Sequence, residues 1–110
     1  MDPELEAQLL TQERDARLWA ALSHPARRAV LEWLDVGPAT ATDLAGSISA
    51  RFGVRRSRAS QHLRALAAAG LVRVIHDGSE RWYAIADDAA LPVARWLRDR
   101  GLISERGEGR

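Results

Sequence analysis

The sequence predicts a mainly α-helical domain of about five helices with one two-stranded β-hairpin. Several stretches repeat apolar residues at helical spacing and are bounded by residues that commonly start or stop helices. Two short stretches rich in Val, Ile, Trp and Tyr flank Asp77-Gly78, a strong signal for a hairpin turn. A chain of 110 residues with 46% hydrophobic residues suits one domain with a modest core. We therefore expect a single domain over residues 1–103, followed by a disordered polar tail at 104–110.

The composition excludes several classes of site. The chain has no cysteine, which removes disulfides, thiolate metal sites and cysteine nucleophiles. No apolar run approaches the roughly 18 residues of a membrane span, and the acidic start lacks the basic region of a signal peptide, so we expect a cytoplasmic protein. No nucleophile and base, paired carboxylates or phosphate-binding glycine loop stand at a useful spacing. We expect neither an enzyme nor a bound cofactor.

The charges are unevenly distributed along the chain, although the net charge is only +1. Residues 1–50 carry four arginines against eight acidic residues, a net −4, whereas residues 51–82 carry seven arginines against two acidic residues, a net +5. Residues 83–110 carry five of each. A basic middle between acidic and neutral ends indicates a surface for a polyanion.

The first predicted helix starts at Asp2-Pro3-Glu4, which combines a capping oxygen, a proline in the first turn and an acid near the positive end of the helix dipole. It should run toward Leu22, either continuous or broken near Thr11. Its apolar residues are sparse in the first half, which one small domain could hardly bury. Docking onto a partner subunit and a frayed terminus both explain this pattern.

Two further helices follow. Ser23-His24-Pro25 is a start signal in which Ser23 or His24 is the cap, and the helix should extend from Pro25 to Leu34. The segment Thr40 to Asp43 matches a capping box, whose side chains satisfy free backbone donors at a helix start. Apolar residues then recur at helical spacing up to Gly53, where this helix should end.

The segment 54–72 combines an apolar stripe with a polar, arginine-rich opposite face, and we expect a helix over residues 55–69. At about 100° per residue, Ala59, Leu63 and Leu66 share one face. The opposite face carries Ser57, Ser60, Gln61 and Arg64. Gly70 should end the helix. Because only a short turn separates this helix from the preceding one, the pair is a helix-turn-helix candidate.

The segment 71–86 forms the predicted hairpin, and a final helix follows it. The hairpin carries Arg73, His76 and Arg81 and directly follows the arginine-rich helix 55–69. A basic hairpin in this place is typical of the wing of a winged helix-turn-helix domain, in which the preceding helix is the recognition helix. Asp87-Asp88 should cap the last helix, over residues 88–100, in which Pro92 is tolerable only in the first turn.

These elements, in this order, resemble the ArsR-type (ArsR/SmtB-like) winged helix-turn-helix transcriptional regulators of bacteria. The resemblance covers about residues 17–86. It rests on LWAALSHPARRAVLEWL at 18–34, TATDLA at 40–45, SRASQHLRALAAAGLVRV at 57–74 and the hairpin ending in RWYAI. The combination of SHPARR, SQHLRAL and AGLV in register is specific, whereas one of these motifs alone would be a weak signal.

The resemblance implies a homodimer that represses transcription by setting two recognition helices into successive major grooves of a pseudo-palindromic operator. The terminal helices, 1–22 and 88–100, would form the dimer interface, with contacts from Leu5, Leu9, Trp19, Val93, Trp96 and Leu97. The expected base contacts are Ser57, Ser60, Gln61 and His62, among which Gln61 suits the hydrogen-bonding edge of adenine. The expected phosphate contacts are Arg55, Arg56, Arg58, Arg64, Arg73 and Arg81.

The chain also departs from this family's pattern. Arg55 stands where the family commonly has a capping Ser, and the stretch SISARFG is longer than usual, which affects the tilt of the recognition helix. Metal-responsive members carry a thiolate pair on the helix before the recognition helix, or Asp and His ligands on the final helix. Here the first position has the sequence TDLAGS and the final helix has no histidine, so we expect no metal site. His24, His62 and His76 are too scattered to replace them.

Two other functions fit the same sequence. The domain could be a winged-helix protein-interaction module that does not bind DNA. It could also be a sensor gated by an effector at an unrecognised site, for which a pocket lined by Trp19 and Trp96 at the dimer interface is one candidate.

Overall fold

The structure is a computed structural model and describes residues 1–103. It contains five α-helices, one 3₁₀ turn and three strands. The helices are α1 (Pro3–Ser23), α2 (Pro25–Trp33), α3 (Ala41–Phe52), α4 (Arg56–Ala68) and α5 (Leu91–Asp99), the 3₁₀ turn is η1 (Leu34–Val36), and the strands are β1 (Ala39–Thr40), β2 (Val72–Asp77) and β3 (Glu80–Ile85). The prediction of five helices with a hairpin wing is confirmed, whereas the tail at 104–110 lies outside the described residues.

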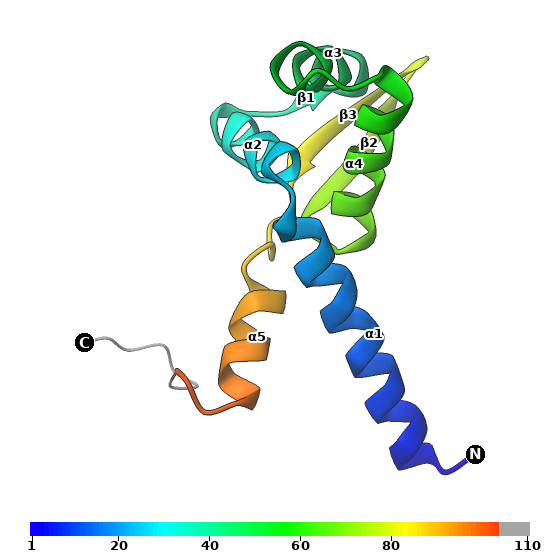
Figure 1. The fold of residues 1–110 in the computed structure, drawn as a ribbon, viewed down its shortest axis with the longest axis vertical. Coiled ribbons are helices and arrows are strands. Elements are labelled where there is room, and N and C mark those ends of the chain that lie inside the picture. The colour runs from blue at the N-terminus through cyan, green and yellow to red at the C-terminus, as the bar shows by residue number, and fades with distance from the viewer. Residues whose placement is uncertain (104–110) are drawn as a thin grey trace.

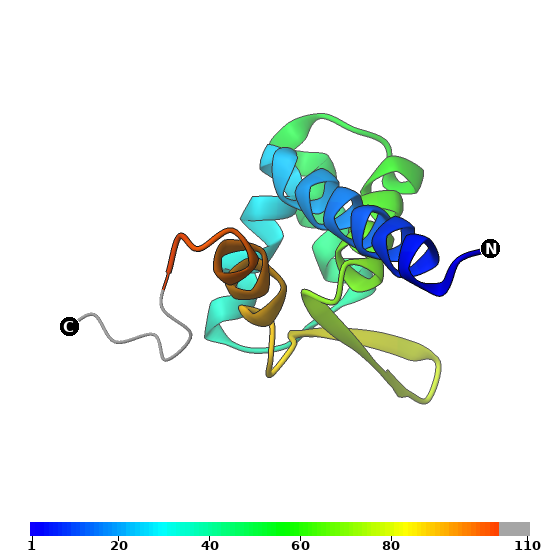
Figure 2. The same ribbon diagram turned by 90° about the horizontal axis from the view of Figure 1, so that it is seen from below.

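Helices α2, α3 and α4 and the sheet form a packed body, from which α1 and α5 project on one side (Figure 1). The radius of gyration is 16.0 Å, compared with the roughly 13 Å typical of a compact chain of this length. Seen from below, α1 and α5 lie across the same end of the body (Figure 2). The projecting helices make the chain more extended than a self-contained domain.

The hydrophobic core joins the end of α1 to the body and the sheet. Tyr83 of β3 is its largest fully buried side chain, and only 2% of its surface is exposed. Around it pack the other core residues, which include Leu18, Val30, Leu34, Leu44, Ile48, Leu63, Leu66 and Val72. Leu63 and Leu66 are core residues that helical periodicity placed on the buried face of α4, whereas Val72 and Tyr83 come from the strands and Leu18 was not predicted.

Two predictions about the terminal helices are wrong in detail. Helix α1 is continuous through Thr11, whose hydroxyl donates to the carbonyl of Ala7 at 3.0 Å inside the helix. Helix α5 begins at Leu91 rather than at Asp88, and residues 87–90 form a turn in which the Asp88 carbonyl, not a side chain, accepts from the Leu91 amide. Pro92 lies in the first turn of α5, as expected, where it removes no helical hydrogen bond.

The sheet has three strands, not the two predicted, because β1 pairs with β3 in the order β1-β3-β2. This strand is only two residues long, and alternation cannot be recognised over so short a segment. Asp77 pairs with Glu80, so the hairpin loop is Gly78-Ser79, one residue later than expected. Gly78 has φ 63°, a conformation that suits glycine in a tight hairpin turn.

No helix among the described residues is long and apolar enough to cross a membrane.

Candidate nucleic-acid interface

Helices α3 and α4 form a helix-turn-helix unit with well-defined ends. The Thr40 hydroxyl accepts from the Asp43 amide at 3.1 Å and caps the start of α3, which confirms the predicted start signal. Gly53 ends α3 with φ 67°, and the chain turns within three residues into α4. Arg55 occupies the N-cap of α4 without a side-chain cap hydrogen bond. The first amides of α4 are therefore free of a side-chain cap.

The end of α4 is fixed where the wing begins. The Gly70 amide donates to the Ala67 carbonyl at 3.0 Å, and the Leu71 amide donates to the Leu66 carbonyl at 3.1 Å. With Gly70 at φ 77°, these two bonds form a Schellman motif. Leu71 and Val72 are buried, and β2 starts at Val72, so only three residues connect α4 to the wing.

The outward stripe of α4 carries three of the predicted contact residues. Ala59, Leu63 and Leu66 are buried, so successive steps of about 100° place Ser57, Gln61 and Arg64 on the opposite, exposed side. Ser60 is partly buried at the edge of this stripe. The stripe presents hydroxyl, amide and guanidinium groups, which together offer both donors and acceptors to a nucleic acid.

His62 does not lie on the exposed stripe, and its burial argues against the expected role as a base contact. Its side chain is only 4% exposed, and its Nδ1 accepts a hydrogen bond from Nε of Arg27 on α2 at 3.0 Å. Burial, followed by the charges of Arg27, His24 and Arg58, lowers the pKa of His62 below its ordinary value of 6.5. The position follows from helical geometry, because residue 62 is one turn from the core residues Ala59 and Leu66.

The arginines of α4 point in different directions around the helix. Arg64 shares the exposed stripe, and Arg58 lies on the flank that faces Arg27 and His62. Arg56 lies on the other flank, where its guanidinium Nη2 would be 3.1 Å from a Cβ placed on Gly46 of α3. The lack of a side chain at Gly46 therefore makes room for Arg56.

Arg73 and Arg81 lie on opposite faces of the wing hairpin. Arg81 pairs with His76, on the hairpin face whose other members, Val72, Val74 and Tyr83, belong to the core beneath α4. Arg73 is an odd number of residues from His76 and therefore projects from the opposite face. Arg81 and His76 thus extend the face of the wing that is turned toward α4, whereas Arg73 is turned away from it.

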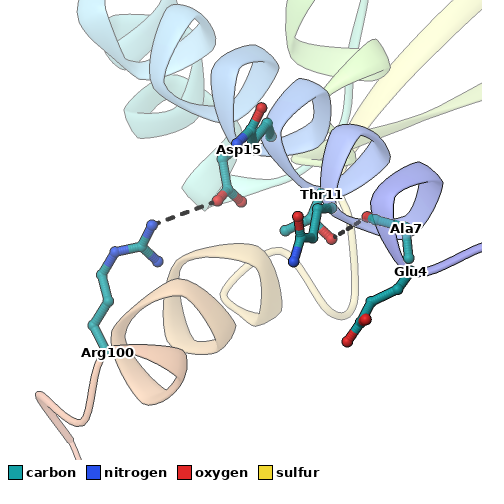
Figure 3. A pocket seen from close by; sticks show the side chains of 7 residues that line it. Glu4, Ala7, Thr11, Asp15 and Arg100 are labelled. Carbon is teal, nitrogen blue, oxygen red and sulfur yellow. Dashed lines mark hydrogen bonds and ion pairs between the residues drawn. The ribbon is translucent and has the colours of Figure 1, made fainter. Parts of the chain in front are cut away.

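Helices α1 and α5 meet through aromatic rings. Trp19 of α1 and Trp96 of α5 pack edge to face with their centroids 5.0 Å apart, and the Arg100 guanidinium lies 4.1 Å from the Trp96 ring centroid. Arg100 also reaches Asp15 at 3.9 Å across a groove of about 450 Å³ between the two helices (Figure 3). The groove is lined by Glu4, Ala7, Gln8, Thr11, Gln12, Asp15 and Arg100.

Comparison with known proteins decides the family. Residues 22–75 match the family model of a helix-turn-helix domain. The solved structure of an ArsR family transcriptional regulator is 30% identical, with a TM-score of 0.66 over 81% of this chain and 88% of the other. An ArsR-like transcriptional regulator from Rhodococcus sp. RHA1 is 32% identical, with a TM-score of 0.63 over 83% of this chain and 82% of the other. The chain belongs to the ArsR family of transcriptional regulators.

A further ArsR-type structure extends over the whole chain. It is the homodimeric winged helix-turn-helix DNA-binding domain of a possible ArsR-family regulator from Mycobacterium bovis, which is 27% identical, with a TM-score of 0.62 over 100% of this chain and 95% of the other. No curated protein matches the chain. The resemblance drawn from the sequence motifs is thus confirmed, and so is the winged helix-turn-helix fold.

The two segments in which the resemblance would place metal ligands, on α3 and on α5, contain neither cysteine nor histidine. The relevant segment of α3 has the sequence TDLAGS, and α5 contains no histidine. Within residues 1–103, no three His, Asp or Glu side chains are grouped so that they could hold a metal ion.

Two arginines at the start of α2 make contacts that the sequence pattern did not predict. Arg27 donates through Nη1 to the Ala20 carbonyl, and Arg28 donates to the Leu22 carbonyl, both at 2.7 Å. They provide positive charge at the end of α1, whose last turn contains no basic residue. The sequence shows that both arginines lie near the end of the first helix. It does not show that Arg27 bonds His62, which is 35 residues away.

Proposed function

We propose that this ArsR-family protein is a homodimeric repressor that binds a pseudo-palindromic operator in double-stranded DNA and acts in the cytoplasm. The observation that carries the proposal is the exposed stripe of Ser57, Gln61 and Arg64 on α4, bordered by the wing face that bears Arg81. A helix of this kind fits the major groove, and the adjacent hairpin reaches the neighbouring backbone. Repression follows because a dimer spread over two half-sites blocks access of polymerase to that DNA.

The dimer is supported by apolar surface that one chain leaves uncovered. Leu5, Leu9 and Trp19 of α1 are 46%, 42% and 40% exposed. Helix α5 contains no buried residue, although Trp96 and Leu97 are partly covered. A second copy that packs on α1 and α5 would bury these residues, including Val93, and would explain why the two helices project from the body.

The contact residues fall into three groups. Ser57 and Gln61 are the proposed base contacts, with Ser60 at the edge of the groove. An exposed amide at position 61 can pair with the N6 and N7 atoms of adenine. The proposed phosphate contacts are Arg55, Arg58, Arg64 and Arg81, together with Arg56 where it lies over Gly46. Arg73 projects from the outer face of the wing, so we assign it a weaker, long-range electrostatic role.

The test begins with selection of a DNA duplex from a random-sequence library by the purified protein, followed by footprinting on that duplex. An inverted repeat protected with half-sites about one helical turn apart would support dimeric binding through two α4 helices. Failure to enrich any duplex, with tight recovery of another protein, would favour the protein-interaction module instead. An inverted repeat bound only after addition of a small molecule would favour the effector-gated sensor.

Gln61→Ala tests the recognition helix directly. Loss of the amide should reduce discrimination at one base position in each half-site by about 1–3 kcal/mol while leaving binding to random DNA nearly unchanged. The control is Glu32→Ala on α2, which also removes a polar side chain, at an exposed position outside the proposed DNA contacts and the proposed dimer contacts. Equal discrimination by the two variants would remove Gln61 from the proposed contacts.

A further inference from the structure

We propose that Arg27 is a positioning residue for the recognition helix, and that it holds α4 only while His62 is neutral. This inference rests on the proposed function, because its measurable consequence is a change in DNA binding. Neither residue belongs to the proposed DNA-contacting set.

Arg27 joins three parts of the molecule through one side chain. It is on α2, its Nη1 donates to the Ala20 carbonyl in the last turn of α1 at 2.7 Å, and its Nε donates to Nδ1 of His62 on α4 at 3.0 Å. Because a guanidinium is planar, the two hydrogen bonds constrain each other's direction. Helix α1, which carries Leu5, Leu9 and Trp19 of the proposed dimer contacts, is thereby linked to the helix that carries Gln61.

The link requires an unprotonated Nδ1 on His62. A protonated ring would present an N–H to the Arg27 N–H, so two donors and two positive charges would meet at hydrogen-bond distance. The groups that act on His62 are His24 at the α1–α2 junction, whose ring centroid lies 5.0 Å away, Arg27 on α2, and Arg58 on α4 itself. Among the described residues, neither α3 nor β2 supplies a charge that offsets them. Burial and these neighbours lower the pKa of His62, so the ring is neutral at neutral pH.

Arg28 provides a matched control for this role. It also donates to a carbonyl at the end of α1, that of Leu22 at 2.7 Å, but it has no hydrogen bond to α4. Arg27→Met and Arg28→Met remove the same charge and a comparable helix-end contact. Only the Arg27 variant removes the link to the recognition helix.

The experiment measures the preference of each variant for a duplex selected by the wild-type protein over a duplex of random sequence. We expect Arg27→Met to lower this preference by about tenfold or more, because misplacement of α4 affects base contacts in both half-sites. We expect Arg28→Met to leave the preference within about threefold of wild type. Sedimentation and thermal unfolding of both variants establish that they are folded dimers. Equal losses in the two variants would overturn the proposal.

His62→Asn supplies a rescue and a pH profile. The Asn side-chain oxygen can take the place of Nδ1 as acceptor, but it cannot be protonated in this range. As the pH falls below about 6.5, the ordinary pKa of histidine, we expect the wild type to lose preference for the selected duplex once His62 protonates, and His62→Asn to retain it. Parallel pH profiles would overturn the requirement for a neutral His62.

A double-mutant cycle separates this mechanism from a direct phosphate contact by Arg27. If Arg27 acts through His62, the losses in Arg27→Met and His62→Leu should not add in the double variant. Additive losses would contradict the positioning role. If the wild-type protein enriches no duplex, the proposed DNA-binding function has failed, and stability of the Arg27 and His62 variants against pH becomes the remaining test. The folded state, whose His62 pKa is lowered, should then lose stability as pH falls below about 6.5 in the wild type but not in His62→Asn.

Discussion

The two wing arginines should differ in their contribution to DNA binding, although they are separated by only eight positions in the sequence. Arg81 is on the hairpin face turned toward α4 and Arg73 is on the opposite face. Each phosphate contact contributes about 0.9 to the slope of log affinity against log salt concentration. Because a substitution occurs twice in a homodimer, Arg81→Ala should reduce the slope by about 1.8. Between about 50 and 200 mM salt, a fourfold change, the ratio of wild-type to variant affinity should then shrink by about tenfold.

Arg73→Ala is the control, since it removes the same charge from the same hairpin. It should change the salt slope by well under one unit. Fluorescence anisotropy of a labelled selected duplex, titrated at four or more salt concentrations, measures both slopes. Equal reductions, or a larger reduction for Arg73→Ala, would refute the use of strand register to decide which face of the wing meets the DNA.

Three further substitutions test other features of the structure. Gly46→Ala should raise the free energy of unfolding by up to about 1 kcal/mol, because alanine favours the helix. It should also weaken DNA binding a few-fold, because the added Cβ would displace the Arg56 guanidinium. Urea unfolding measures the first effect and fluorescence anisotropy measures the second. Thr40→Ala should lower the free energy of unfolding by about 0.5–2 kcal/mol through loss of the α3 cap, and an unchanged urea midpoint would contradict that role. Trp96→Ala should weaken the dimer by about tenfold or more, because the part of this ring left uncovered in one chain would be buried at the proposed interface, and full burial of a large apolar side chain contributes about 1.5–3 kcal/mol. Sedimentation over a range of concentrations detects the monomer, and an unchanged dissociation constant would place the interface elsewhere.

Local signals predicted the helix-turn-helix unit well. Thr40 caps α3, and Gly53 and Gly70 take the left-handed conformations that end α3 and α4. Such signals are reliable because each depends on the backbone of only four or five neighbouring residues. Where the local signal was ambiguous, the prediction failed. Asp87-Asp88 resembles a helix cap, but Pro92 fits only in the first turn, so the helix starts at Leu91.

The candidate site was predicted less completely than the fold. Periodicity placed Ser57, Gln61 and Arg64 on an exposed face, because their positions relative to the core residues follow from helix geometry alone. The family resemblance added His62 to the same surface, although the ring is buried against Arg27. A polar residue at the border between core and surface can turn either way, and its direction depends on a partner from another helix.

The sequence by itself determined which segments are helices, which hairpin is the wing and which arginine-rich helix face is exposed, because these properties depend on residues a few positions apart. Only the tertiary structure decided which arginine of the wing faces α4, that Arg56 fits over Gly46, and that Arg27 connects the end of α1 to His62. Each of these contacts depends on strand register or on how separate helices pack. Helical or strand periodicity does not fix which side chains of two separate elements come into contact.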